Sequence, residues 1–172
     1  LAAGKGTRMK SKLPKVMQPL AGMPLLEHVI SSARELNPRK IIVVYGFGGD
    51  QVKKHFKKYK DIEWVYQEEQ LGTGHAVNQA IDFVPDGDKA LILYGDVPLI
   101  STSTLQPLIQ RNIDRDLHLL SAIVPSASGY GRIIREKNRI ISIIEDSDAN
   151  EKVRKINEIN TGIMSCRADQ MK

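Results

Sequence analysis

The first residues of the chain combine small side chains with two cations in a pattern that suits an anionic ligand. The sequence opens Leu-Ala-Ala-Gly-Lys-Gly-Thr-Arg-Met, and Leu-Pro-Lys follows at 13–15. Gly4 and Gly6 lack a Cβ, so the backbone can adopt positive φ and bring its N–H groups close to an anion. Arg8 supplies a rigid fork of donors, and Lys15 a mobile point charge. We predict a loop that binds a triphosphate, with Arg8 and Lys15 as its catalytic cations.

The standard phosphate-loop motifs do not describe this segment. No Gly-Lys-Ser/Thr follows a four-residue spacer, which excludes a Walker loop. Met9 stands where a dinucleotide fingerprint has its third glycine. The alternative interpretation is a strand-to-helix turn whose glycines serve geometry and whose cations face water.

Apolar runs bounded by turns alternate with helical periods up to about residue 128. The strand candidates are 40–45, 63–66, 90–94 and 117–124. Their continuous hydrophobicity is typical of strands buried on both faces of a parallel sheet. A helix is expected from Pro24, and Asp50 and Ser101 are expected to cap the next two. This order predicts an α/β fold with a doubly wound, Rossmann-like, mostly parallel sheet.

The pattern changes after residue 128. Segments 132–136 and 139–144 flank Lys-Asn and predict a hairpin, the polar stretch 146–155 a short helix or lid, and 157–166 a further strand. We therefore expect a hairpin and lid inserted after residue 128.

The amino-acid composition limits which functional classes of protein the chain can belong to. A chain of 172 residues with 41% hydrophobic content suits one domain with a real core, and no apolar run approaches a membrane span. Cys166 is the only cysteine, so no internal disulfide is expected and a cytoplasmic location fits. The basic run at 53–60 predicts a solvated helix face, without a nucleic-acid-binding motif beside it.

Three polar segments follow apolar strands and are expected to share one cleft. They are the Gly4 loop, residues 67–75 and Gly95-Asp96. Ligands of open α/β sheets bind beyond the carboxyl ends of the strands. Asp96 is a candidate ligand for Mg²⁺, which keeps waters and substrate phosphates in its shell; the alternative is a turn or capping aspartate.

Several blocks, in this order, resemble one enzyme family. Besides the opening segment and Pro14-Lys15, they are 67–76 (QEEQLGTGHA), 93–99 (LYGDVPL), 129–132 (GYGR) and 158–162 (EINTG). Together they resemble the sugar-nucleotide pyrophosphorylases, most closely the uridylyltransferase domains of bacterial bifunctional N-acetylglucosamine-1-phosphate uridylyltransferase/glucosamine-1-phosphate acetyltransferases. The resemblance covers nearly the whole chain and implies the nucleotide-diphospho-sugar transferase fold.

The resemblance also implies binding roles for individual residues. It implies nucleotide binding by Leu1, Ala2, Ala3, Gly4, Gln67, Gly72, Thr73, Tyr94 and Gly95. It implies sugar binding by Gly131, Glu145, Asn160 and Thr161, and Mg²⁺ binding by Asp96 with a second ligand, an asparagine, beyond Lys172. The nucleotide-binding part is then 1–128 and the sugar-binding part 129–172.

Each of these residues also has a purely structural interpretation. Gln67 can end a strand ahead of a helix capped by Thr73, Glu145 can lie at a hairpin edge, and Asn160 can cap. A glutamine amide can flip to suit uracil or cytosine, so fixed backbone partners in the Leu-Gly-Thr-Gly turn are expected to discriminate. His75 is expected to pack at a helix start, since a sugar phosphate is already largely dianionic and needs no base.

The activity implied is transfer of UMP from UTP to N-acetylglucosamine 1-phosphate, giving UDP-N-acetylglucosamine and pyrophosphate for cell-wall precursors. Alternatives are a thymidylyl-, cytidylyl- or adenylyltransferase acting on another sugar phosphate, or a catalytically silent regulatory domain. The resemblance further implies a homotrimer formed through a downstream acetyltransferase domain, with no partner in nucleic acid or membrane. Since Leu1 lies inside an expected strand and Lys172 inside an expected helix start, we expect a chain truncated at both ends and inactive alone.

Overall fold

The computed structural model describes residues 1–172 except 5, 7–8, 10, 12 and 111–116. Its strands are β1 (Pro19–Leu20), β2 (Met23–Pro24), β3 (Ile41–Tyr45), β4 (Ile62–Tyr66), β5 (Lys89–Ile92), β6 (His118–Ile123), β7 (Arg132–Glu136), β8 (Arg139–Ile144) and β9 (Glu158–Arg167). Its α-helices are α1 (Leu25–Glu35), α2 (Gly49–His55), α3 (Thr73–Ala80), α4 (Thr102–Gln110) and α5 (Glu151–Arg154). Short 3-10 helices are η2 (Lys15–Met17), η3 (Phe56–Lys58), η4 (Ile81–Phe83) and η5 (Ala168–Gln170).

The main sheet has the order β4, β3, residues 1–3, β5, β9, β6. β3 pairs with β4 in parallel, and Ala2 forms a parallel bridge to Tyr45. On the other side, Leu1 donates to Leu93 O over 2.6 Å, and Gly95 N donates to Leu1 O over 2.8 Å. β5 and β6 both run antiparallel to β9, so β9 alone is reversed. The mostly parallel, doubly wound fold is therefore confirmed.

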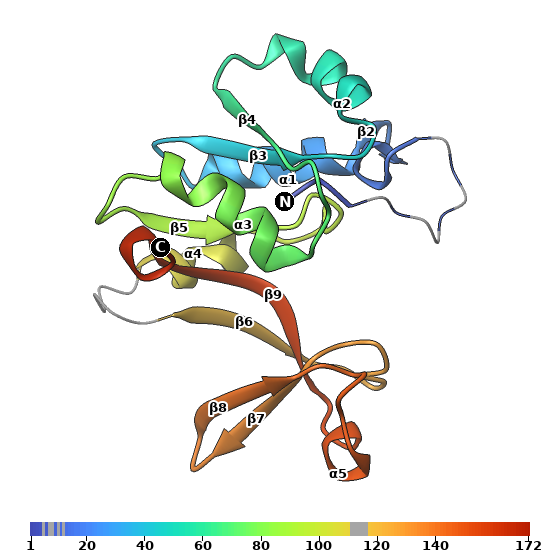
Figure 1. Ribbon diagram of the computed structural model, residues 1–172, viewed down its shortest axis with the longest axis vertical. Helices are drawn as coiled ribbons and strands as arrows, with labels where there is room; N and C mark the ends of the chain where they lie inside the picture. Colours follow the sequence, from blue (N-terminus) through green and yellow to red (C-terminus); the bar gives the residue numbers. More distant parts are fainter. Residues whose placement is uncertain (5, 7–8, 10, 12, 111–116) are drawn as a thin grey trace.

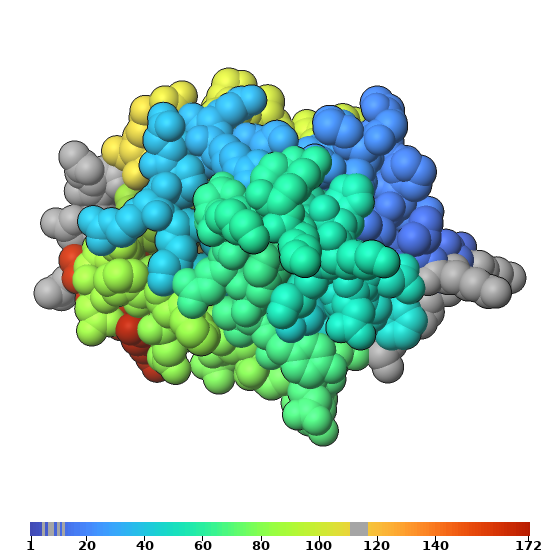
Figure 2. Space-filling model, turned by 90° about the horizontal axis from the view of Figure 1, so that it is seen from above, coloured from blue at the N-terminus to red at the C-terminus, as the bar shows by residue number. Residues whose placement is uncertain are grey.

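Alternation along β3 divides the core into two layers. Val43 belongs to a cluster with α1, α2 and Phe56, whereas Val44 belongs to a cluster with Val65 and Ala76 of α3. Successive strand residues point to opposite faces, so both faces of β3 are buried. The α4 helix covers β5 and β9. Seen from above, α2 and its neighbouring segments cover the middle of the upper face (Figure 2).

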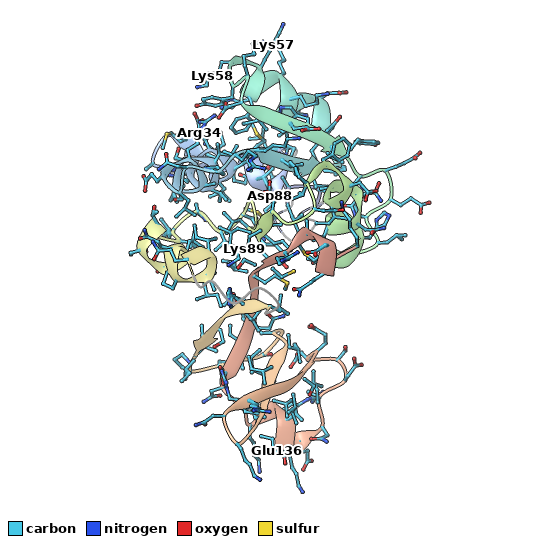
Figure 3. All side chains as sticks on the ribbon, turned by 90° about the vertical axis from the view of Figure 1, so that its left-hand side faces the viewer. Arg34, Lys57, Lys58, Asp88, Lys89 and Glu136 are labelled. Carbon is cyan, nitrogen blue, oxygen red and sulfur yellow. The ribbon has the colours of Figure 1, made fainter. Side chains whose placement is uncertain are left out.

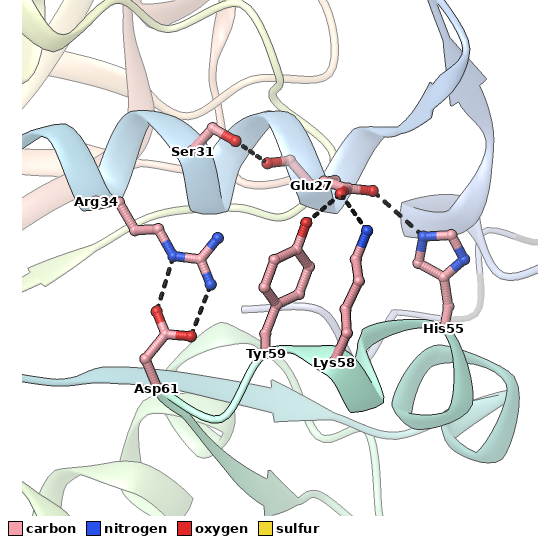
Figure 4. Close-up of polar contacts among 7 residues, drawn as sticks. All are labelled: Glu27, Ser31, Arg34, His55, Lys58, Tyr59 and Asp61. Atoms are coloured by element: carbon pink, nitrogen blue, oxygen red, sulfur yellow. Dashed lines mark hydrogen bonds and ion pairs between the residues drawn. The ribbon is translucent and has the colours of Figure 1, made fainter.

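A polar cluster fastens α1 to the η3 segment (Figure 4). The buried Glu27 carboxylate accepts hydrogen bonds from Tyr59, from Lys58 over 3.3 Å and from His55 over 3.2 Å. The Tyr59 hydroxyl is the main cause that lowers the pKa of Glu27. About two turns further along α1, Arg34 forms two 2.8 Å hydrogen bonds with Asp61. A charged group can thus be buried on α1 because the segment from the end of α2 to Tyr59 supplies its hydrogen-bond donors.

The hairpin has the predicted bounds and projects from the sheet. In the described residues, the strand pairing between β7 and β9 consists of Arg132 opposite Ile159. Arg135 adds two 2.7 Å hydrogen bonds to Glu158. Figure 3 shows Glu136 at the end of the molecule opposite Lys57. None of the helices in the described part of the chain has the length and apolar content needed to span a membrane.

The helix starts differ in part from the expectations. Ser101 caps α4 as predicted, since its Oγ accepts from Thr104 N over 3.3 Å. Asp50 does not cap α2: the cap residue is Gly48, in the left-handed region at φ 68°. A Cβ at Gly48 would lie 2.4 Å from Pro14 Cγ, so only glycine lets α2 pack on the residue before Lys15. Thr73 does not cap α3; Gly72 occupies that position.

An apolar cavity of about 500 Å³ lies between β3 and β5. Residues 41–44 and 89–93 line its two sides, and α1 and α3 residues close its faces. In the described part of the chain only residues 1–3 enter the gap between these strands, at its carboxyl end (Figure 1). The cavity therefore lies next to Leu1, in the gap between β3 and β5.

A chain extended before Leu1 by five β-branched apolar residues should be more stable than residues 1–172. The added segment would bury apolar surface and pair with strand edges on both sides. We expect a Tm at least about 5 °C higher, because each kcal/mol moves Tm by about 2–4 °C in a chain of this size. Calorimetry measures it. An extension of five Gly/Ser residues is the control, and an equal Tm for both extensions would contradict a strand-shaped cavity.

The ion pair between Arg135 and Glu158, which holds the hairpin to β9, should make the stability of the fold depend on pH. Hydrogen bonds from Arg135 first and Ser121 second lower the pKa of Glu158 from 4.5 to about 2. Because the pKa of Glu158 is lower in the folded than in the unfolded state, its ionised carboxylate stabilises the fold. This stabilisation is complete above pH 4.5 and is lost as the pH falls toward 2. Denaturant unfolding at several pH values should show this loss in the protein and a smaller one in Glu158→Gln.

The matched control for this loss is Glu136→Gln, on the same hairpin. Glu136 forms no ion pair within the residues described. Its replacement should leave the acid-dependent loss unchanged. Equal pH profiles for the protein and Glu158→Gln would contradict the anchoring role.

Candidate functional site

The structure describes only part of the predicted phosphate loop. Arg8 lies outside the described residues, as do Lys5 and Thr7. Gly6 has φ 59°, and a Cβ there would lie 2.7 Å from Lys15 Cβ. The loop therefore returns onto η2 at a point where only glycine fits, which brings Gly6 against Lys15.

Lys15 and Asp96 form an ion pair across the carboxyl edge of the sheet. Their side chains are 42% and 25% exposed, so both remain accessible to solvent. Gly95 is buried, and a Cβ there would lie 3.0 Å from Leu26 and 3.2 Å from Leu1 O. This tight packing fixes the backbone at the end of β5, from which Asp96 projects. The structure thus brings together a cation and a carboxylate that are 81 positions apart in the sequence.

The carboxylate of Asp96 fits a Mg²⁺ ligand. Mg²⁺ is commonly held by one or two carboxylates, with waters and substrate phosphates completing its shell. Within the described ranges, no three or more His, Cys, Asp or Glu residues form a dedicated metal cage. One accessible carboxylate beside a cation suits a metal that arrives with a polyphosphate.

Gln67 lies at the end of β4, next to the turn that precedes α3. Its backbone N–H donates to Tyr45 O over 2.8 Å, and the residue is only 2% exposed. Its Nε2 lies 3.5 Å from Gly72 O and 2.9 Å from His75 Nδ1. His75 lies in the first turn of α3 as predicted, but its ring contacts Gln67 directly. That contact was not foreseen, because the pattern of a helix start does not say where a ring points.

Two further residues of this region have no role in the sequence-based assignment, although Gln70 lies in the block at 67–76. Gln70 donates to Gln67 O over 3.2 Å and to Glu68 O over 3.1 Å, which closes the turn after β4. Gly46 follows β3, and a Cβ there would meet Gln70 Nε2 at 3.0 Å and Ala3 at 3.1 Å. The only sequence signal was position: Gly46 follows a strand, and strand ends converge at this edge.

The proposed sugar-side residues come together at the base of the hairpin. Asn160 N donates to Gly131 O over 2.8 Å. A Cβ on the buried Gly131 would lie 3.0 Å from Glu145 Oε1. The Asn160 Oδ1 accepts from Gly162 N over 2.8 Å, and Thr161 Oγ1 donates to Leu120 O over 2.5 Å. No partner is found among the described residues for the amide N–H groups of Asn160, whereas the Thr161 side chain holds the strand.

A bulge in β9 connects this side with the end of β5. Leu119 pairs with Met164 and Ser121 with Asn160, so three residues of β9 oppose one of β6. Bulges redirect side chains beside functional sites. Within the bulge, Gly162 has φ 77°, and a Cβ there would lie 2.4 Å from Tyr94 Oη. Tyr94 directly precedes Gly95-Asp96, so the two halves of the site touch at Gly162.

Cys166, His28 and His118 lie outside the candidate site. Burial raises the pKa of the Cys166 thiol, which suits the predicted packing role. His28 contacts Leu20 O over 2.8 Å, and His118 contacts Leu108 O over 2.8 Å.

The Gly162→Ala substitution should disturb the site more than its strain alone explains. Positive φ costs an alanine about 1–2 kcal/mol, and the clash with Tyr94 adds about 1–3 kcal/mol. The matched control is Gly87→Ala, at φ 84° with open space around it. Urea unfolding should show a clearly larger loss of stability for Gly162→Ala, and equal losses would contradict the Tyr94 contact.

Comparisons with known proteins agree with this geometry. Residues 1–157 match the family described as MobA-like NTP transferase domain. The bifunctional protein GlmU of Acinetobacter baumannii (strain AYE) is 53% identical over 163 residues, which cover 95% of this chain. That of Halorhodospira halophila is 49% identical over 173 residues, which cover the whole chain. The chain spans 36% of the length of both relatives.

Solved structures share the fold. A putative glucose-1-phosphate thymidylyltransferase from Bacillus anthracis superposes with a TM-score of 0.78 over 99% of this chain and 70% of that chain, at 18% identity. HddC from Yersinia pseudotuberculosis, complexed with GMP-PN, gives 0.75 over 99% of this chain and 76% of that chain, at 21% identity. At such identities the likeness establishes the fold alone.

Proposed function

The chain belongs to the family of MobA-like NTP transferase domains, and we propose that it transfers UMP from UTP to N-acetylglucosamine 1-phosphate. The products are UDP-N-acetylglucosamine and pyrophosphate. The observation that carries the proposal is the meeting of Lys15 and Asp96 at the edge where Gly4 follows residues 1–3 and Gln67 follows β4. Relatives about half identical over nearly the whole chain support it.

The chemistry needs charge control rather than a base. A sugar 1-phosphate is largely dianionic near neutrality, because its second pKa is about 6. Its oxygen attacks the α-phosphorus, the bond to the bridging oxygen breaks, and pyrophosphate leaves with that electron pair. The obstacle is that an anion must approach an anion. Alignment and charge neutralisation therefore account for the catalysis.

The residues of the site divide these tasks. Lys15 would lie near the α-phosphate, and Arg8 with the backbone at 4–7 would hold the departing phosphates. Asp96 would hold Mg²⁺, which supplies positive charge to the phosphate oxygens when bound. Because Lys15 pairs with Asp96 in the described structure, its ammonium group is held at the cleft until a phosphate replaces the carboxylate as its partner.

The remaining contacts select the two substrates. Gln67, Gly72 and Thr73 would face the base, while Leu1, Ala2, Ala3, Tyr94 and Gly95 would surround the rest of the nucleotide. Gly131, Glu145, Asn160 and the Thr161 backbone would bind the sugar. A trimer, a cytoplasmic location and a role in cell-wall precursor synthesis follow from the same resemblance and are part of the proposal.

Pyrophosphate release by the full-length protein that contains residues 1–172, measured across a panel of nucleotides and sugar phosphates, tests the proposal. UTP with N-acetylglucosamine 1-phosphate should give the highest kcat/KM. A preference for thymidine, cytidine or adenosine triphosphate would replace it with another sugar-1-phosphate nucleotidyltransferase. No turnover with any pair would favour a silent domain.

Lys15→Ala should lower kcat/KM about a hundredfold, which is about 3 kcal/mol of transition-state stabilisation. Arg8→Ala is expected from the sequence to do the same, and Asp96→Asn should abolish turnover or raise the Mg²⁺ requirement. Lys57→Ala, an exposed lysine of the basic run (Figure 3), is the charge-matched control and should keep full activity. Folded Lys15→Ala protein with near wild-type turnover would refute the assignment of the phosphate site.

A further inference from the structure

A line of polar side chains runs from the end of β4 along the first turns of α3. Gln67 Nε2 lies 2.9 Å from His75 Nδ1, and Gln79 Nε2 lies 3.1 Å from His75 Nε2. Gln67 is buried, while His75 and Gln79 are half-buried. The imidazole of His75 thus joins a buried amide to one that reaches the surface.

The imidazole N–H of His75 and the amide hydrogens of Gln67 and Gln79 can be arranged in only a few ways. A neutral imidazole carries one N–H and one lone pair, so it accepts from one amide and donates to the other. If Gln67 donates to Nδ1, the Nε2 of the ring carries the proton and Gln79 must turn its oxygen toward it. If Gln79 donates to Nε2, Gln67 must instead turn its oxygen toward Nδ1. Imidazole and amide orientations are therefore coupled.

The carbonyl of Gly72 decides between the two arrangements. Gln67 Nε2 lies 3.5 Å from Gly72 O, so its two hydrogens have two acceptors, Gly72 O and His75 Nδ1. A reversed amide would set its oxygen against that carbonyl oxygen, and a buried amide would then lose hydrogen bonds. Gln79, half-buried at the surface, can reverse its amide without such a loss. The neutral tautomer of His75 that fits these contacts carries its proton on Nε2.

This arrangement leaves one group of Gln67 available. Its Oε1 has no hydrogen-bond partner within the described ranges, although the residue is 2% exposed. Among the described residues, the fully buried side-chain atoms without a partner are His118 Nε2 and Arg132 Nε, so the unpaired Oε1 of Gln67 keeps some solvent access and is suited to a donor on a ligand. The amide of Gln67 would then meet a base with its oxygen and not with its nitrogen.

We propose that His75 selects uracil over cytosine by holding the amide of Gln67 with its oxygen toward the base. The proposal rests on the proposed function, in which Gln67 faces the base of the nucleotide. Uracil presents an N–H at N3, which pairs with an amide oxygen; cytosine presents a lone pair there, which an amide oxygen repels. His75 is thus a positioning residue, and it removes the freedom to flip that a glutamine alone would have.

The first test measures the tautomer directly. Nitrogen-15 NMR of the ligand-free protein, with His75 assigned from a His75→Asn sample, should show a protonated Nε2 and an unprotonated Nδ1. A proton on Nδ1 would overturn the proposal. This readout needs neither substrate nor activity, so it stands even if UTP is not the substrate.

The second test measures selectivity as the ratio of kcat/KM for UTP to that for CTP. His75→Leu removes the acceptor at Nδ1 and should lower the ratio about tenfold or more, the effect expected when one buried group can mispair. His75→Asn, whose Oδ1 can replace Nδ1 as an acceptor, should retain most of the ratio. Gln79→Met is the matched control, because water can accept from Nε2, and it should change the ratio by less than about threefold.

The outcomes separate this proposal from the proposed function. If the protein itself does not use UTP, the proposed function fails, and the NMR measurement still decides the tautomer. If the protein prefers UTP and folded His75→Leu keeps that preference, the positioning role is overturned. Equal loss of selectivity in His75→Leu and His75→Asn would show that packing of the ring matters and not its acceptor nitrogen.

Discussion

The hydrogen bonds of residues 1–3 hold the two halves of the main sheet together. Ala2 N donates to Val44 O over 2.7 Å on one side, while Leu1 pairs with Leu93 and Gly95 on the other. Because these are parallel pairings, the carboxyl ends of β3, β4 and β5 come to the same edge. The residues proposed to bind the nucleotide depend on that alignment. The cavity behind Leu1 shows how little of the space between β3 and β5 this short segment fills.

The second half of the site depends on the reversed strand. β9 runs from the hairpin into the main sheet, so its bulge at 161–163 lies between the sugar-side residues and the end of β5. Tyr94 packs on Gly162 at this point. A displacement in either half would be transmitted through this contact, since neither the ring nor the tightly turned backbone has room to adjust.

Charge is balanced within the site by contacts that a ligand can replace. Lys15 and Asp96 neutralise one another, and the half-exposed side chains keep the pair accessible. An exposed ion pair contributes little to stability, so exchanging it for contacts with phosphate and metal costs the fold little. By contrast, the buried carboxylate of Glu27, surrounded by three donors, serves the fold and cannot be released so easily.

The sequence by itself determined much of this protein. Apolar runs and turn residues predicted the strands, the bounds of the hairpin and the α/β class, because hydrophobic periodicity and the positions of turn residues are local properties of the sequence. The small residues and cations near the start, Asp96 after an apolar strand, and the motif blocks predicted the site and the family. Only the tertiary structure decided which groups touch: the Lys15–Asp96 pair, the packing of Tyr94 on Gly162, the Gly48 cap in place of Asp50, and the line from Gln67 through His75 to Gln79. These contacts join segments whose relative position and side-chain direction follow from packing in three dimensions, which no local pattern encodes.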